Sequence, residues 1–281
     1  MKITRLVGGL GAEISEVNLA DEMPSPVVNK VKQSLWQSHL VIFRDQQLSP
    51  DAQITFGKHL GELKKHPLIG SLEGYPEIMM VIKEPQDEHN FAGAWHTDTS
   101  YQETPAMASL LYAIEVPEDL GDTLFCNMVA AYEALSPSMQ SFLESLRAMH
   151  SFTGRSFAGR EQDLGYGALA KGSGTLPSIS QPVIRTHPQS GRRGIYVNPM
   201  FTESIIGLTS AESDTILTLL FEHCVKAEFC YRLRWQPGTV AIWDNLTTMH
   251  YPLNDYAGHR RIMRRIVIAG TERSGATVAS N

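Results

Sequence analysis

The chain has 281 residues and a mass of 31.2 kDa, and its 42% hydrophobic and 19% charged residues exclude a disordered or low-complexity protein. Its 24 Lys and Arg against 30 Asp and Glu give a net charge of −6, which argues against nucleic acid or an anionic membrane as the main partner. The cysteines are odd in number and lack CxxC spacing, so we expect packing residues rather than disulfides or a zinc site: Cys126, Cys224 and Cys230. No apolar run of about 18 residues and no signal-like amino terminus occur, so the sequence predicts a cytoplasmic protein.

The first sixty residues are predicted to hold three strands and two helices. Alternating or apolar segments predict strands at Ile3–Val7, Ala12–Val17 and Leu40–Phe43, the first two separated by a glycine-rich turn. One helix is expected from Ser25 and another from Ser49, because Ser is a good N-cap and Pro follows it in both cases. The predicted order is therefore strand, strand, helix, strand, helix.

The rest of the chain is predicted to be richer in strands than in helices. Strands are expected at Ile78–Ile82, Met107–Ile114, Ile195–Val197, Glu228–Trp235, Val240–Trp243 and Ile262–Ile268. Two helix starts lie among them, because Ser136 precedes a proline as an N-cap and Thr209 forms a capping box with Glu212. Many short strands, few helices and no glycine-rich nucleotide-binding motif predict a β-sandwich or barrel with flanking helices.

The chain contains no repeat and no linker, so one domain is expected over residues 1–281. The segment Gly154–Pro182 is rich in glycine, serine and charge and has little periodicity. Such a long loop in a compact domain is usually a lid or a mobile insert near a functional site. Residues 271–281 are expected to form a frayed tail.

The segment at 95–98 holds two candidate metal ligands. His96 and Asp98 are two positions apart, so their side chains share one face of an extended chain. His250 follows an apolar strand and offers a third ligand, and two histidines with one carboxylate form the facial triad of non-haem Fe(II) oxygenases. Because His-x-Asp occurs often by chance, a hydrogen-bonded structural pair is the alternative.

A basic segment at 259–268 is the candidate anion site. Arg261 and Arg265 share one face of the predicted strand about 13 Å apart, while Arg260 and Arg264 share the other. A buried Arg requires an anion, and its planar fork suits carboxylates and sulfonates, so the segment indicates a cavity for two small anions. Surface ion pairs with the acidic excess are the alternative explanation.

Several motifs occur here in the order in which one known family has them. They are Trp-His-Thr-Asp at 95–98, Gly-Asp-Thr-Leu at 121–124, Ala-Ala-Tyr-Glu-Ala-Leu at 130–135, Trp-Asp-Asn at 243–245 ahead of His250, and Asp-Tyr at 255–256 before Arg260 and Arg261. On these motifs the chain resembles the taurine dioxygenase (TauD/TfdA) family of Fe(II)- and 2-oxoglutarate-dependent dioxygenases. The likeness extends from Gly11 to Arg265 and argues against chance.

The resemblance implies a mainly β fold with flanking helices, the double-stranded β-helix or jelly-roll. It implies Fe(II), 2-oxoglutarate and O₂ as cofactor and cosubstrates, with His96, Asp98 and His250 as iron ligands and catalytic centre. Thr123 and Arg261 fall where the family holds the distal carboxylate of 2-oxoglutarate.

The resemblance also assigns residues to the primary substrate. Arg265 and His66 match positions that meet its anionic head, and Thr99, Tyr101 and Phe201 fall at positions that line its pocket. For Arg265, an ion pair with an internal Asp or Glu is the alternative. Trp243 and Asn245, by contrast, are expected to support the turn before His250 rather than to bind a ligand.

The segment before the metal motif departs from the taurine enzymes. Where these carry a polar, Asn-rich stretch that holds the taurine amine, this chain has Phe91–Ala94. Leu120 also replaces the first of two glycines often seen before the Asp-Thr pair. An amine contact is therefore not expected, and a substrate with an apolar body fits better.

The expected reaction converts 2-oxoglutarate to succinate and CO₂ and hydroxylates a small anionic substrate: a sulfonate such as taurine, an alkyl sulfate or an aryloxyalkanoate. C–S or C–O cleavage follows if the hydroxyl falls on the carbon that bears the leaving group. No nucleic-acid or membrane partner is expected, and a homo-oligomer stays open. A metal-dependent hydrolase or isomerase on the same barrel, and a non-catalytic small-molecule sensor, are the alternatives.

Overall fold

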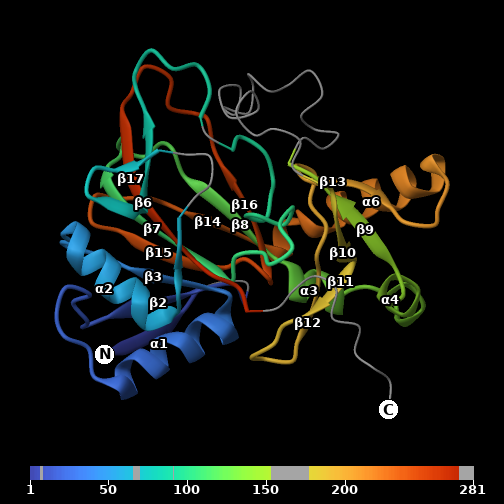
Figure 1. Ribbon diagram of the computed structural model, residues 1–281, viewed down its shortest axis with the longest axis horizontal. Helices are drawn as coiled ribbons and strands as arrows, with labels where there is room; N and C mark the ends of the chain where they lie inside the picture. Colours follow the sequence, from blue (N-terminus) through green and yellow to red (C-terminus); the bar gives the residue numbers. More distant parts are fainter. Residues whose placement is uncertain (7–8, 66–69, 91, 153–176, 272–281) are drawn as a thin grey trace.

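A computed structural model describes residues 1–6, 9–65, 70–90, 92–152 and 177–271 of the chain (Figure 1). Its largest element is a nine-stranded sheet. In spatial order the sheet contains β1 (Lys2–Arg5), β2 (Ala12–Ser15), β3 (Leu40–Phe43), β15 (Val240–Asp244), β7 (Ala108–Glu115), β17 (Arg261–Ile268), β6 (Tyr75–Lys83) and β5 (Ser71–Leu72), and β4 (Leu63–Lys64) also pairs with β17. Neighbours in sequence are thus often separated in the sheet, so the central strands β15, β7 and β17 come from distant parts of the chain.

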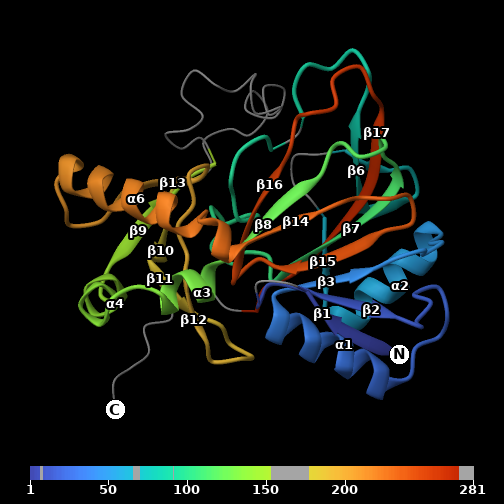
Figure 2. The same ribbon diagram turned by 180° about the vertical axis from the view of Figure 1, so that it is seen from behind.

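A second, three-stranded sheet lies against the first (Figure 2). Its order is β14 (Cys230–Leu233), β8 (Thr123–Asn127) and β16 (Thr248–Pro252), all antiparallel. Apolar side chains of both sheets meet in one buried cluster, in which the Phe125 and Trp243 rings lie 5.5 Å apart. The large sheet is antiparallel except for the parallel pair β2–β3, and its packing on the small antiparallel sheet around a common core confirms the predicted jelly-roll.

Helices α1 (Ser25–Ser38) and α2 (Pro50–Leu60) cover the outer face of the large sheet (Figure 1). Helix α2 lies so close to β17 that a Cβ on Gly57 would come within 2.2 Å of Ile266 Cδ1. The outer side of the small sheet packs on a second apolar cluster, which includes side chains of α3 (Met128–Glu133), α4 (Pro137–Glu144) and α6 (Ser210–Cys224). The remaining elements are β9 (Arg147–His150), β10 (Ile179–Pro182), β11 (Ile184–Thr186), β12 (Arg193–Ile195), β13 (Thr202–Ile205) and a 3₁₀ turn at Ala227–Phe229.

Local signals predicted several elements well. The strand Leu40–Phe43 has the predicted bounds, Ser49 caps α2 through its bond from the Ala52 amide, and Thr209 and Glu212 form both bonds of the capping box. The expected cap at Ser25 was wrong, because Pro24 stands at the N-cap position of α1 without a side-chain bond.

The predicted loop Gly154–Pro182 was wrong at its end, since Ile179–Pro182 forms β10 and pairs in register with Arg147–His150. This pairing partner lies outside the segment, so no local pattern signals the strand. The rest of the segment up to residue 176 lies outside the described residues, as do residues 272–281 of the predicted tail. Within the described residues, no helix is both long and apolar enough to cross a lipid bilayer.

Candidate active site

Backbone pairing brings the two halves of the metal motif together. The His96 amide donates to the His250 carbonyl at 3.0 Å, and the His250 amide donates to the His96 carbonyl at 2.8 Å. The Thr97 hydroxyl adds a 3.0 Å bond to the Thr248 carbonyl of β16. This two-sided bridge holds the segment at 95–98 against β16 at the level where His250 stands.

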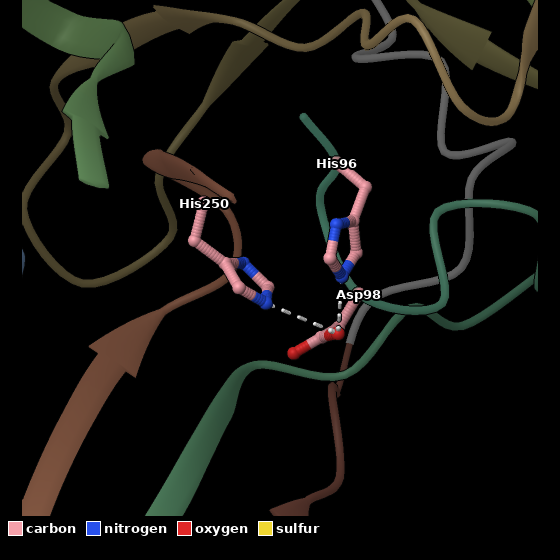
Figure 3. A group of neighbouring side chains, drawn as sticks. All are labelled: His96, Asp98 and His250. Atoms are coloured by element: carbon pink, nitrogen blue, oxygen red, sulfur yellow. Dashed lines mark ion pairs between the residues drawn. The ribbon is translucent and has the colours of Figure 1, made fainter. Parts of the chain in front are cut away.

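The side chains of His96, Asp98 and His250 converge (Figure 3). Their nearest ligand atoms all lie within 4.8 Å of one another, with Asp98 Oδ1 3.5 Å from His96 Nε2 and 3.8 Å from His250 Nε2. His96 Nδ1 lies 2.8 Å from the Ala94 carbonyl, so Nδ1 carries the proton and the Nε2 lone pair faces the other two ligands. This donor set fits Fe(II).

The triad is buried, with side chains of His96, Asp98 and His250 all under a tenth exposed. Burial by itself would raise the pKa of Asp98, but the Arg265 guanidinium and the two imidazoles outweigh it and hold this pKa well below its usual range. Burial and the neighbouring His96 lower the pKa of His250. An ionised carboxylate and a neutral imidazole are the forms that coordinate a metal ion.

A cavity beside the triad is lined by Arg261 and Arg265, so the two arginines share a face as predicted. Nε and Nη2 of Arg261 are buried and have no hydrogen-bond partner among the described residues. Thr123 Oγ1 accepts a 2.9 Å bond from Trp235 Nε1, which leaves its hydroxyl proton free to donate. Unpaired buried donors of this kind fit an anion in the cavity.

Gly121 allows the loop before Thr123 to pass close to the Arg261 side chain. Its φ is +71°, and an added Cβ would lie 3.2 Å from the Tyr256 ring and 3.4 Å from Arg261 Cδ. Its amide donates to Asp255 Oδ1 at 2.8 Å. A side chain at this position would therefore strain the backbone and crowd the guanidinium.

Arg265 reaches the triad itself. Its Nη2 forms an ion pair with Asp98 Oδ2 and donates to Ser109 Oγ at 3.0 Å. Its Nε is buried and without a hydrogen-bond partner among the described residues. The guanidinium thus binds an internal carboxylate and still presents one unused donor.

Aromatic rings form a wall beside His96. The Tyr101 ring lies 4.9 Å from that of Phe201 and 5.1 Å from that of Phe152, and Phe201 lies 6.2 Å from the His96 ring. All three aromatic side chains are buried, and with Ala92 they belong to one apolar cluster. The structure therefore brings two of the predicted pocket residues next to the triad.

The two remaining predicted substrate residues are Thr99 and His66. The Thr99 hydroxyl accepts a 2.8 Å bond from the Ala106 amide, which leaves its proton free to donate. His66 lies outside the described residues. Their substrate contacts stay predictions.

Sequence reasoning missed Phe152, Trp235 and Ser109. Phe152 follows β9, a strand that was not predicted, and Trp235 was seen only as a strand end. Ser109 had one usable signal, because it is a polar residue inside the apolar run Met107–Ile114. Such a residue in a buried strand needs a hydrogen-bond partner.

The jelly-roll and its His-Asp-His site define a class, the non-haem iron dioxygenases that depend on 2-oxoglutarate. The family model described as "Taurine catabolism dioxygenase TauD, TfdA family" matches residues 2–267. The chain belongs to this family, as the motifs predicted, and its members use Fe(II), 2-oxoglutarate and O₂. The comparisons give no support to a hydrolase, an isomerase or a sensor.

Named relatives and solved structures agree with this. An alkylsulfatase of Acinetobacter baylyi is 31% identical over 98% of this chain and 87% of its own length. An alpha-ketoglutarate-dependent 2,4-dichlorophenoxyacetate dioxygenase of Cupriavidus pinatubonensis is 32% identical, over 90% of this chain and 92% of its own. A crystal structure of a taurine dioxygenase from Burkholderia xenovorans has a TM-score of 0.83 at 31% identity, covering 96% of this chain and 89% of that one.

Proposed function

We propose that the chain hydroxylates a small anionic organic molecule with an apolar body, such as an alkyl sulfate, a sulfonate or an aryloxyalkanoate. The observation that carries the proposal is the cavity in which the buried triad meets two arginines with unused N–H groups. Names of relatives support the anionic class, since they include an alkylsulfatase and a 2,4-dichlorophenoxyacetate dioxygenase. We further propose that the chain acts as a single domain in the cytoplasm.

His96, Asp98 and His250 would hold the iron, which when bound supplies the oxidation of 2-oxoglutarate to succinate and CO₂ and of a substrate C–H bond. Arg261, with unpaired Nε and Nη2, would bind the distal carboxylate of 2-oxoglutarate together with the Thr123 hydroxyl. A planar guanidinium binds a carboxylate through two parallel bonds, which fixes its orientation as well as its charge.

Arg265 would address the substrate anion through its unused Nε while Nη2 stays on Asp98. Tyr101 and Phe201 would cover the apolar body, because their rings form the wall beside His96. Phe91–Ala94 offers no polar side chain, so the substrate we propose has no ammonium group to be recognised there. These residues together exclude water from the carbon that reacts.

The test is substrate-dependent succinate formation by iron-loaded protein with a panel of alkyl sulfates, sulfonates and aryloxyalkanoates, each beside a neutral ester or amide of the same shape. We expect turnover of at least one anion and poor turnover of its neutral partner. In Arg265→Ala the ratio of kcat/KM between anion and neutral partner should fall about 10- to 150-fold, the equivalent of one charge-assisted pair of about 1.5 to 3 kcal/mol. Equal turnover of neutral and anionic partners by the wild type would contradict the anion pocket.

A further inference from the structure

The two oxygens of Asp98 have different surroundings. Oδ1 faces the imidazoles of His96 and His250, at 3.5 and 3.8 Å from their Nε2 atoms. Oδ2 points away from them and accepts a 2.7 Å hydrogen bond from Ser109 Oγ, in addition to the ion pair with Arg265. One oxygen is therefore presented to the metal site and the other is held by the protein.

The Ser109 hydroxyl has every one of its hydrogen-bonding positions filled. It donates to Asp98 Oδ2 and accepts from Asn245 Nδ2 at 3.1 Å and from Arg265 Nη2 at 3.0 Å. A hydroxyl has one donor and two acceptor positions, so two incoming N–H groups direct its proton to Asp98. The serine is fully buried in β7, between β15 and β17.

The backbone of Asn245 is held in place, while its side-chain Oδ1 has no hydrogen-bond partner among the described residues. Asn245 follows β15 directly, its side chain is fully buried, and its backbone amide donates to the Met107 carbonyl at 2.8 Å. The Trp-Asp-Asn motif that precedes His250 thus reaches Asp98 through Ser109. This links both metal-binding segments to the centre of the large sheet.

We propose that Ser109, oriented by Asn245, is a positioning residue that holds Asp98 Oδ2, so that Asp98 binds the metal through Oδ1 alone. The inference rests on the proposed function, because it takes the triad as the metal site. Hydrogen bonds to a ligating carboxylate typically change metal affinity by 10- to 100-fold.

A purely structural role for Ser109 makes a different prediction. If the hydroxyl served only to satisfy Asn245 and Arg265, its loss would lower the stability of the fold and leave metal binding by the folded protein unchanged. The measurement that separates the two is therefore the metal dissociation constant of folded protein. Thermal unfolding of each variant reports the structural effect alongside.

The experiment compares Ser109→Thr with Ser109→Val, two side chains of the same shape of which only Thr carries the hydroxyl, together with Ser109→Ala. Co(II) and Mn(II) binding is measured by calorimetry without oxygen, and Co(II) absorption reports the coordination. Ser34→Ala is the matched control, a buried serine of α1 whose hydroxyl donates to the Lys30 carbonyl of its own helix and to no other group among the described residues.

We expect Kd to rise about 10- to 100-fold in Ser109→Ala, and by the same factor in Ser109→Val relative to Ser109→Thr, with an altered Co(II) spectrum. Ser34→Ala should bind like the wild type. The role proposed for Ser109 is wrong if the Kd values of Ser109→Val and Ser109→Thr lie within threefold of each other and those of Ser109→Ala and the wild type do so too. The proposed function would stand in that case. If the wild type binds no metal, or if His96→Ala binds it equally well, the proposed function fails and the inference falls with it.

Discussion

The described part of the chain buries two groups in which histidine meets a carboxylate, and only one of them is built to bind something. In the first, His96, Asp98 and His250 converge beside a cavity whose arginines have unused donors. In the second, His187 Nε2 lies 2.8 Å from Asp244 Oδ2, and both side chains are about 1% exposed. Each group pairs at least one histidine with one aspartate.

The second group has its other polar atoms used within the protein. His187 Nδ1 accepts from the Ser190 amide at 3.0 Å, and Asp244 Oδ1 accepts from the Leu246 amide at 2.8 Å. Nearby, His39 Nδ1 lies 2.9 Å from the Thr247 hydroxyl. We call these residues, His39, His187, Asp244 and Thr247, the His187 cluster. It ties the β11–β12 hairpin to the turn between β15 and β16, a structural task.

A buried group of histidine and carboxylate therefore marks a ligand site when several donor atoms face one common space. At the triad, three nitrogen and oxygen atoms do so, and unpaired guanidinium donors lie beside them. In the His187 cluster, the atoms face one another or backbone amides. Mutations should therefore separate the two groups by what they damage.

The largest effect is expected at His187. His187→Ala leaves the Asp244 carboxylate buried without the imidazole that faces it, so the free energy of unfolding should fall by about 3 to 5 kcal/mol. Urea unfolding measures this, and the Co(II) Kd of the protein that remains folded should match the wild type. If His187→Ala changed the Kd and left the free energy of unfolding unchanged, His187 would contribute to metal binding and not to stability.

Asp98→Ala should damage metal binding instead. It removes the only carboxylate of the triad, so metal affinity should fall by at least about 100-fold, beyond what the loss of an outer hydrogen bond causes. Calorimetry with Co(II) or Mn(II) checks this, and unfolding in urea should change less than in His187→Ala. Wild-type affinity in this variant would remove Asp98 from the site.

Arg261→Lys keeps the charge beside the triad but loses the planar fork. With one charge-assisted bond of about 1.5 kcal/mol lost, the KM for 2-oxoglutarate should rise about tenfold. Arg260→Lys is the control, since Arg260 is an exposed neighbour on the same segment that pairs with Glu84 and Glu115. If KM for 2-oxoglutarate changed by a similar factor in both variants, the effect of Arg261→Lys would not come from the place of Arg261 in the cavity.

The smallest effect concerns pH and the His187 cluster. Burial lowers the pKa of His39 to about 4, although Asp244 acts in the opposite direction. Unfolded protein then binds more protons than folded protein between pH 6.5 and 4, so stability falls as the pH falls through this range. Between pH 6.5 and 5.5 the loss from His39 should be about 1 kcal/mol.

Urea unfolding at these two pH values tests this, with His39→Asn as the variant. Asn accepts the left-handed backbone of His39, whose φ is 65°, and does not titrate. The variant should lose about 1 kcal/mol less on acidification than the wild type. An identical pH dependence would show that His39 is not kept neutral by its surroundings.

Elements that depend on interactions between neighbouring residues could be predicted from the sequence. The apolar run of β3, the capping box at Thr209 and the N-cap at Ser49 each depend on a few neighbouring residues, and all stand where predicted. The motifs likewise determined the family and the jelly-roll. Such signals survive because capping and periodicity need no partner from elsewhere in the chain.

Contacts between buried polar residues that are distant in sequence became visible only in the tertiary structure. The bridge between His96 and His250, the pairing of β10 with β9, and the contact of Ser109 with Asp98 all join segments without a shared local pattern. The sequence could not show that His187 finds Asp244 while Arg265 finds Asp98. Strand pairing sets these meetings, because a sheet places each residue opposite another by register rather than by distance along the chain.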